Sequence, residues 1–511
     1  MRFLFCLTIS IFLFSQPTYA AWHKAEGEHF VIYANQNASS VKKFAERLEA
    51  YHAAMTFMLK REPESPSPSN RVTVFVVSSK SSVRKLADLK SRYVAGVYRP
   101  LAGNIVSIVP KLSSNHSKYT LSGETVLRHE YAHHFLFNIS KQTFPLWFQE
   151  GFAEFYASGR NENDGTVILG GAANHRAYEL HFSKNVPIER LLNTSEYLKK
   201  KTKRYDEFYG RSWMLFHYLT FAKDRRKQLS QYQKMLFNGI DEMDAAKKSF
   251  GDLRALNADL NRYAQKKRIS VFAIPPDRLT TKPVSVQRLD DAEAAIMPII
   301  MESRTGVDEE EAKEIVVEAR DIATKYPGSA AVQEALAEAE YDAGYDNLAI
   351  AAADKALAID PTRVRAQIQK IYAFRRKAEN AEDANAAWKD VRSQIVAANR
   401  METNHPIPLI EFYNTFRAAG REPSTVAIQG LERALQLAPF DQSLRLTMTA
   451  QYLEDRKFDL AAQTIRPLAY NPHRSGATQA AEKLLNIAEK QLANLAKEPQ
   501  KPETPASIAS E

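Results

Sequence analysis

The most constraining feature of this sequence is the string H-E-Y-A-H at residues 129–133. A second segment, residues 147–154, follows it in the chain and contains two further glutamates. Residues four apart lie on one face of an α-helix, so the imidazoles of His129 and His133 can point at one ion. A carboxylate from a second helix can complete a three-ligand site, and Glu150 is the candidate. The sequence therefore predicts two helices that meet at these side chains.

The pattern also predicts which metal and which chemistry belong there. Two histidines, one carboxylate and a water make up a common catalytic zinc site, so we expect Zn²⁺. Glu130 lies beside the first ligand, where a general base for that water is needed. Nitrogen and carboxylate ligands accept other divalent ions as well. The alternative interpretation is a surface helix rich in His and Glu, followed by an amphipathic helix.

Local signals support both helices. Ser122 can cap the first helix, and Pro145 suits the first position of the second, which we expect to end before Gly159. Gly151 costs about 1 kcal/mol relative to alanine inside a helix. Its presence predicts that another helix approaches closely there. His134 points away from the ligand face, and we interpret it as structural.

The segment 147–153 reads W-x-x-E-G-x-A and, together with the H-E-x-x-H string, resembles the gluzincin branch of zinc metallopeptidases, which includes thermolysin and aminopeptidase N. The resemblance covers about residues 22–270. It implies an α+β, thermolysin/aminopeptidase-like zincin domain with a small N-terminal mixed sheet. It implies zinc binding by three side chains: His129, His133 and Glu150. It also implies Glu130 as the general base and a hydrogen bond from Glu154 to a ligand histidine.

Residues 209–219 are similar to the aminopeptidase N segment in which a tyrosine opens a helix and donates to the developing oxyanion. Tyr209 is therefore the candidate oxyanion stabiliser, with Tyr205 as the second choice. The alternative for Tyr209 is a core aromatic at a helix start. Those aminopeptidases also carry a G-x-M-E-N strand, but residues 95–100 read A-G-V-Y-R-P and contain no acid. We therefore expect cleavage within chains rather than at an amino terminus.

The N-terminus has the pattern of a signal peptide over residues 1–20: Arg2, an apolar run at 3–14, and T-Y-A at 18–20. The run is too short to span a membrane, so no transmembrane span is expected after cleavage. An uncleaved anchor is the alternative. The only cysteine, Cys6, lies inside this segment, so the mature chain has no disulfide. A large exported chain without disulfides indicates a periplasmic or secreted bacterial protein.

Composition and pattern divide the rest of the chain. We assign residues 21–273 to the metallopeptidase-like domain, the proline-marked segment 274–289 to a linker, and 290–496 to helical repeats. Residues 497–511 are rich in Pro, Glu, Ser and Ala and predict a disordered tail.

The repeat region has positions typical of a tetratricopeptide repeat. Small residues and prolines match the pattern at Leu336, Gly344, Ala349, Ala356 and Pro361. The spacing predicts an all-α tetratricopeptide-like solenoid of about four helix pairs, with a concave surface for a protein partner. The alternative is an unrelated helical bundle.

The formal net charge is +9, with basic clusters at 199–204, 225–227 and 266–268. These clusters fit solvated helix faces and loops, or attraction to anionic lipid or an acidic polymer. No nucleic-acid-binding motif accompanies them, so no nucleic-acid partner is expected.

The sequence as a whole predicts an exported zinc metallopeptidase, acting on peptide or protein substrates, with repeats that bind a protein. The alternative from another class is a non-catalytic, zinc-containing scaffold or assembly factor. Hydrolysis of a non-peptide acyl bond is a third hypothesis.

Overall fold

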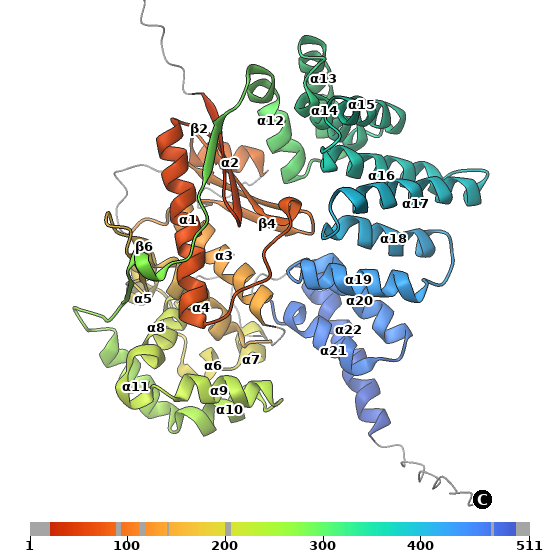
Figure 1. The fold of residues 1–511 in the computed structure, drawn as a ribbon. Helices are drawn as coiled ribbons and strands as arrows, with labels where there is room; N and C mark the ends of the chain where they lie inside the picture. The colour runs from red at the N-terminus through yellow and green to blue at the C-terminus, as the bar shows by residue number, and fades with distance from the viewer. Residues whose placement is uncertain are drawn as a thin grey trace, which may run out of the picture.

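The computed structural model describes residues 21–87, 94–111, 119–140, 143–199, 206–471 and 475–496. The expected signal peptide at 1–20, the expected tail at 497–511 and the second-choice residue Tyr205 lie outside these ranges. The described chain forms a mixed α/β region and an arc of helices along one side of it (Figure 1).

A six-stranded mixed sheet forms the first layer, in the order β4-β5-β3-β2-β1-β9. Its strands are β1 Trp22–Glu26, β2 Phe30–Asn35, β3 Val72–Val77, β4 Val97–Leu101, β5 Asn104–Pro110 and β9 Ser285–Arg288. The β2–β3 and β3–β5 pairs are parallel, and the other pairs are antiparallel. The β4–β5 hairpin turns at Gly103, whose φ of +67° favours glycine. In this strand order, β4 lies at one edge of the sheet.

The segment 274–289 differs from the expected linker. It connects the two regions, and it also contributes β9, which pairs with β1 through Ala25 and Val286. Just before it, β8 (Phe272–Ile274) joins a small sheet with β6 (Arg160–Asn161) and β7 (Val167–Leu169). Strands β8 and β9 are short and lie near Pro275 and Pro283, so their local pattern is weak. The free edges of β1 and β7 supply the hydrogen-bond partners that order them.

Helices α1 Ala38–Leu59, α2 Lys80–Leu86 and α3 Gly123–Ile139 pack against the sheet. The other helices of the first region are α4 Leu146–Ala157, α5 Ala177–Phe182, α6 Ile188–Leu191, α7 Thr194–Lys199, α8 Phe208–Phe221, α9 Gln228–Phe237, α10 Glu242–Phe250 and α11 Leu253–Tyr263. Helix α1 buries one face against the sheet, with Val41, Phe44 and Leu48 in the core. Helix α4 is buried along its whole length, which explains its apolar sequence.

The second region is a solenoid of antiparallel helices (Figure 1). It contains α12 Asp291–Thr305, α13 Glu309–Lys325, α14 Ala330–Asp342, α15 Asp346–Ile359, α16 Val364–Glu379, α17 Ala384–Met401, α18 Pro406–Ala418, α19 Thr425–Leu437, α20 Gln442–Glu454, α21 Phe458–Ala469 and α22 Gly476–Leu495. Gly344 turns the chain between α14 and α15 at a φ of +87°, and Ala349 and Ala356 are fully buried. The described residues thus hold one helix pair more than expected, and α22 follows. None of the described helices is both long and apolar enough to cross a bilayer.

The C-terminal end of the solenoid shares a continuous apolar core with the first region, which the sequence did not indicate. Direct hydrogen bonds join the two. Ala102 N donates to Asp441 Oδ2 at 2.8 Å, and Asn70 Nδ2 donates to the Leu437 carbonyl at 2.7 Å. The two regions are therefore packed together rather than tethered by a free linker.

Candidate metal centre

Helices α3 and α4 carry the predicted ligands. Ser122 caps α3 as expected, since its Oγ accepts from Thr125 N at 3.0 Å. Helix α4 begins at Leu146, one residue after the expected Pro145, and ends before Gly159. The capping and proline signals therefore located the starts of both helices to within a residue.

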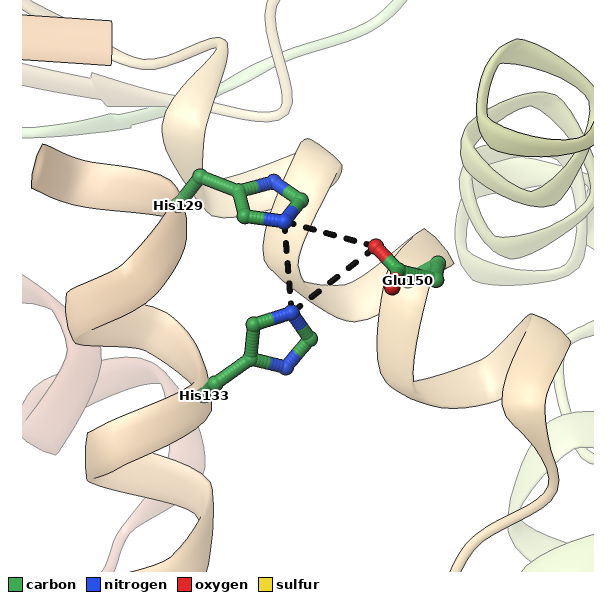
Figure 2. A group of neighbouring side chains, drawn as sticks. All are labelled: His129, His133 and Glu150. Carbon is green, nitrogen blue, oxygen red and sulfur yellow. Dashed lines mark hydrogen bonds and ion pairs between the residues drawn. The ribbon is translucent and has the colours of Figure 1, made fainter. Parts of the chain in front are cut away.

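The structure brings His129, His133 and Glu150 together (Figure 2). The two Nε2 atoms lie 3.2 Å apart. Glu150 Oε2 lies 3.3 Å from Nε2 of His129 and 3.8 Å from Nε2 of His133. Zinc bonds of about 2.0–2.2 Å at tetrahedral angles separate neighbouring ligand atoms by roughly 3.3–3.5 Å. The observed separations of 3.2, 3.3 and 3.8 Å depart from this range by about 0.3 Å at most, so small side-chain adjustments would let the three atoms bind one zinc ion.

Glu150 is the strongest indication that this cluster would hold a cation. Its side chain is 0% exposed, and neither carboxylate oxygen has a hydrogen bond of acceptable geometry. Burial alone would raise the pKa of this carboxyl, but His129 and His133 outweigh burial and hold the pKa well below its usual range. A charged carboxylate buried in this way costs several kcal/mol unless a partner compensates it. A divalent cation between the three ligands would supply that partner.

Glu154 lies behind the candidate ligand His129, one helical turn after Glu150. Its Oε1 lies 3.2 Å from His129 Nδ1, on the side of the ring away from the ligand atom Nε2. Burial opposes ionisation of Glu154, but Arg176 and His129 hold its pKa well below the usual range. Burial also lowers the pKa of His129, yet Glu154 and Glu150 outweigh burial and raise that pKa to about 10. The two carboxylates therefore favour a cation at this point, either a proton or a metal ion.

Two further residues hold Glu154, and sequence reasoning missed both. His175 Nε2 lies 2.7 Å from Glu154 Oε2, and Arg176 Nε donates to Oε1 at 2.9 Å. Both side chains come from a short 3-10 turn at Asn174–Arg176. No helical or strand periodicity marks this turn, and no motif connects it with a glutamate more than twenty residues earlier.

Tyr209, the candidate oxyanion stabiliser, lies near the start of α8. The guanidinium carbon of Arg176 lies 4.7 Å from the centre of its ring. The charge of Glu150, followed by burial, raises the pKa of Tyr209 well above its ordinary value. The hydroxyl therefore stays protonated and is available as a hydrogen-bond donor near Glu150.

Gly151 lies at the contact between α4 and α8, as its position in the sequence predicted. A Cβ at this residue would lie 2.5 Å from the Ser212 carbonyl oxygen and 2.9 Å from Phe216 Cβ. The absence of a side chain lets α8 approach α4 directly beside Glu150. Gly151 thus lets the helix that carries Tyr209 pack next to Glu150, the candidate ligand on α4.

A cavity of about 300 Å³ opens onto Glu130 and His133. Edge strand β4 contributes Tyr98 to its wall. His134 packs between Tyr131 and Phe440, with ring centres 5.6 Å and 4.5 Å away, and burial lowers its pKa to about 3. These contacts agree with the structural interpretation of His134.

Comparisons with known proteins locate the same segment but give no activity. A family model described as a protein of unknown function (DUF1570) matches residues 124–238, which include His129, Glu150 and Tyr209. No curated protein matches the chain.

Solved structures similar to this chain include tetratricopeptide-repeat proteins. TTC0263, a thermophilic TPR protein of Thermus thermophilus, is 15% identical with a TM-score of 0.32, covering 40% of this chain and 99% of its own. MamA is 15% identical with a TM-score of 0.26, covering 42% and 100%. Pseudomonas aeruginosa pilF is 16% identical with a TM-score of 0.30, covering 40% and 94%. These TM-scores are below 0.5, so the solenoid assignment depends on the helix pairs of this chain itself.

Proposed function

We propose that this chain is an exported zinc-dependent peptidase that cleaves within peptide chains, and that its helical repeats bind a protein partner. The observation that carries the proposal is the buried Glu150 carboxylate, which lacks hydrogen bonds and faces two histidine Nε2 atoms. His129, His133 and Glu150 would hold the zinc. When bound, zinc lowers the pKa of a water toward about 7 and polarises a carbonyl.

The other residues have separate roles in this proposal. Glu130, on the cavity wall beside His133, accepts the proton of the attacking water and later transfers it to the leaving amine. Tyr209 donates a hydrogen bond to the oxygen that becomes negative during attack. Glu154 keeps the His129 ring oriented and raises its basicity, and His175 and Arg176 hold Glu154 in turn.

The number of ligands favours an enzyme over the scaffold alternative. Structural zinc sites use four protein ligands, whereas catalytic sites use three. Among the residues that the structure describes, the cluster contains three side chains, with no fourth His, Cys, Asp or Glu. A purely structural site also has no need of an acid at position 130 beside a cavity.

Replacing the proposed base tests this function. Glu130→Gln should keep bound zinc, because residue 130 is not a ligand, and should abolish hydrolysis of fluorescently labelled casein. Glu46→Gln serves as the matched control, since Glu46 is exposed on α1 away from the cavity. Metal content is measured on both purified variants. Unchanged casein hydrolysis by Glu130→Gln, or a wild-type protein that binds no zinc, would refute the proposal.

A further inference from the structure

The cavity above the candidate metal centre is not built by the first region alone. Its wall includes Phe440 just before α20, Gln442 at the first position of α20, and Asn471 after α21. These residues lie about 300 positions after Glu130 in the chain, yet they line the same cavity of about 300 Å³. The C-terminal end of the solenoid thus faces the site directly.

Contacts around this wall hold it in place. Gln149, next to the ligand Glu150, donates from Nε2 to the Phe144 carbonyl at 2.7 Å and to the Tyr470 carbonyl at 3.3 Å. Phe440 is 6% exposed and packs against His134 of α3. The solenoid wall is therefore attached to both ligand helices, α3 and α4.

The chemistry of the cavity indicates what it can bind. Among its described lining residues, Glu130 is the one carboxylate, and there is no lysine or arginine. Tyr98, Pro100, Phe137 and Phe440 supply apolar surface, and amide groups come from Gln149, Gln442 and Asn471. Amides pair with peptide groups, whereas the described lining residues include no lysine or arginine that would hold a carboxylate side chain. A volume of about 300 Å³ is at the small end for ligand sites, so the cavity suits a short peptide segment.

We infer that the last helices of the solenoid are part of the substrate-binding site, and that Phe440, Gln442 and Asn471 select uncharged peptide segments. The peptide-cleavage part of this inference rests on the proposed function, whereas peptide binding in the cavity can be measured without cleavage. The repeats then have a role in selectivity that is separate from any partner on their concave face.

Charge variants at Gln442 test the inference, because Gln442 is half-buried and can accept a charge without opening the core. The variants Gln442→Lys and Gln442→Glu are made in the zinc-loaded Glu130→Gln protein. The probes are labelled, end-blocked hexapeptides in which Asp, Ala or Lys occupies each position in turn. Affinity is measured by fluorescence anisotropy, and circular dichroism checks the fold. Gln479→Lys and Gln479→Glu are matched controls, since Gln479 is exposed near the start of α22 and does not line the cavity.

For each peptide position we compare the affinity of the Asp peptide with that of the Lys peptide. At one or more positions Gln442→Lys should raise this Asp-to-Lys affinity ratio by about three- to tenfold, as expected for one partly screened charge pair. Gln442→Glu should lower the ratio. The Gln479 variants should leave the ratio unchanged. Equal ratios in all the variants, or no peptide binding at all, would overturn the inference.

Activity separates this result from the proposed function. If wild-type protein cleaves peptides while the peptide affinities do not respond to residue 442, the inference fails and the peptidase proposal stands. If affinities respond but wild-type protein cleaves nothing, the peptide-binding site stands and the peptidase proposal fails.

Discussion

Replacing Gly151 with alanine is a direct test of how α4 and α8 build the site. In an ordinary helix this change is stabilising, by about 1 kcal/mol, because alanine has the higher helix propensity. At Gly151 the new Cβ would lie 2.5 Å from the Ser212 carbonyl oxygen. That atom belongs to the backbone of α8 and cannot rotate away. Insertion of a methyl group into a packed contact costs about 1–3 kcal/mol, so the two effects oppose each other.

Gly430 provides a matched control for the propensity effect. It also lies inside a helix, α19, but a Cβ there would meet the Leu409 carbonyl oxygen at 3.8 Å, an ordinary van der Waals distance. Both substitutions gain the same helix propensity, so this gain cancels when the free energies of unfolding of the two variants are subtracted. Gly151→Ala should therefore be less stable than Gly430→Ala by about 1–3 kcal/mol.

Urea unfolding followed by circular dichroism measures this difference, and a competing chelator measures zinc affinity. Gly151→Ala should also bind zinc more weakly, because the substituted residue is next to the ligand Glu150 and α8 must move. Equal unfolding midpoints for the two variants would show that α4 and α8 do not meet as described. A destabilised Gly151→Ala with unchanged zinc affinity would show that the helix contact does not position the ligand.

Two further predictions concern the second carboxylate and the effect of pH. Glu154→Gln should weaken zinc binding by about 10–100-fold in chelator competition, because His129 loses the group that orients its ring. A zinc affinity within about twofold of wild type would contradict that role of Glu154. In metal-free protein the folded pKa of His129 is about 10, above its ordinary value, so protonated His129 stabilises the fold. This contribution is complete below about pH 6.5 and is lost as pH rises through the folded value. The urea concentration at the unfolding midpoint of metal-free protein should therefore decrease as pH rises from about 7 to about 10. The midpoint of metal-free His129→Gln should decrease less over the same range. The same decrease in both proteins would show that protonated His129 does not stabilise the fold.

Short-range chemistry made much of the candidate site predictable. The four-residue spacing of His129 and His133 places both rings on one helix face wherever the helix packs. Ser122 and Pro145 mark helix starts through backbone hydrogen bonding and fixed φ, which are local effects. Gly151 indicated a close helix because glycine otherwise destabilises a helix interior. Each of these signals depends on a single residue or on residues within about one helical turn of each other.

Other features depended on contacts between distant segments. His175 and Arg176 reach Glu154 from a turn without periodic pattern, and β9 is ordered by the free edge of β1. The solenoid residues Phe440 and Gln442 line the cavity only because the helices curve back over the first region.

The sequence by itself determined the residues proposed as metal ligands, the helices that carry them and the repeat character of the second region, because those properties follow from neighbouring residues. Only the tertiary structure decided that Glu150 lies within 4 Å of both histidines and that the repeats form a wall of the cavity. The physical reason is that such contacts arise from burial of shared apolar surface between segments far apart in the chain, which no local pattern records.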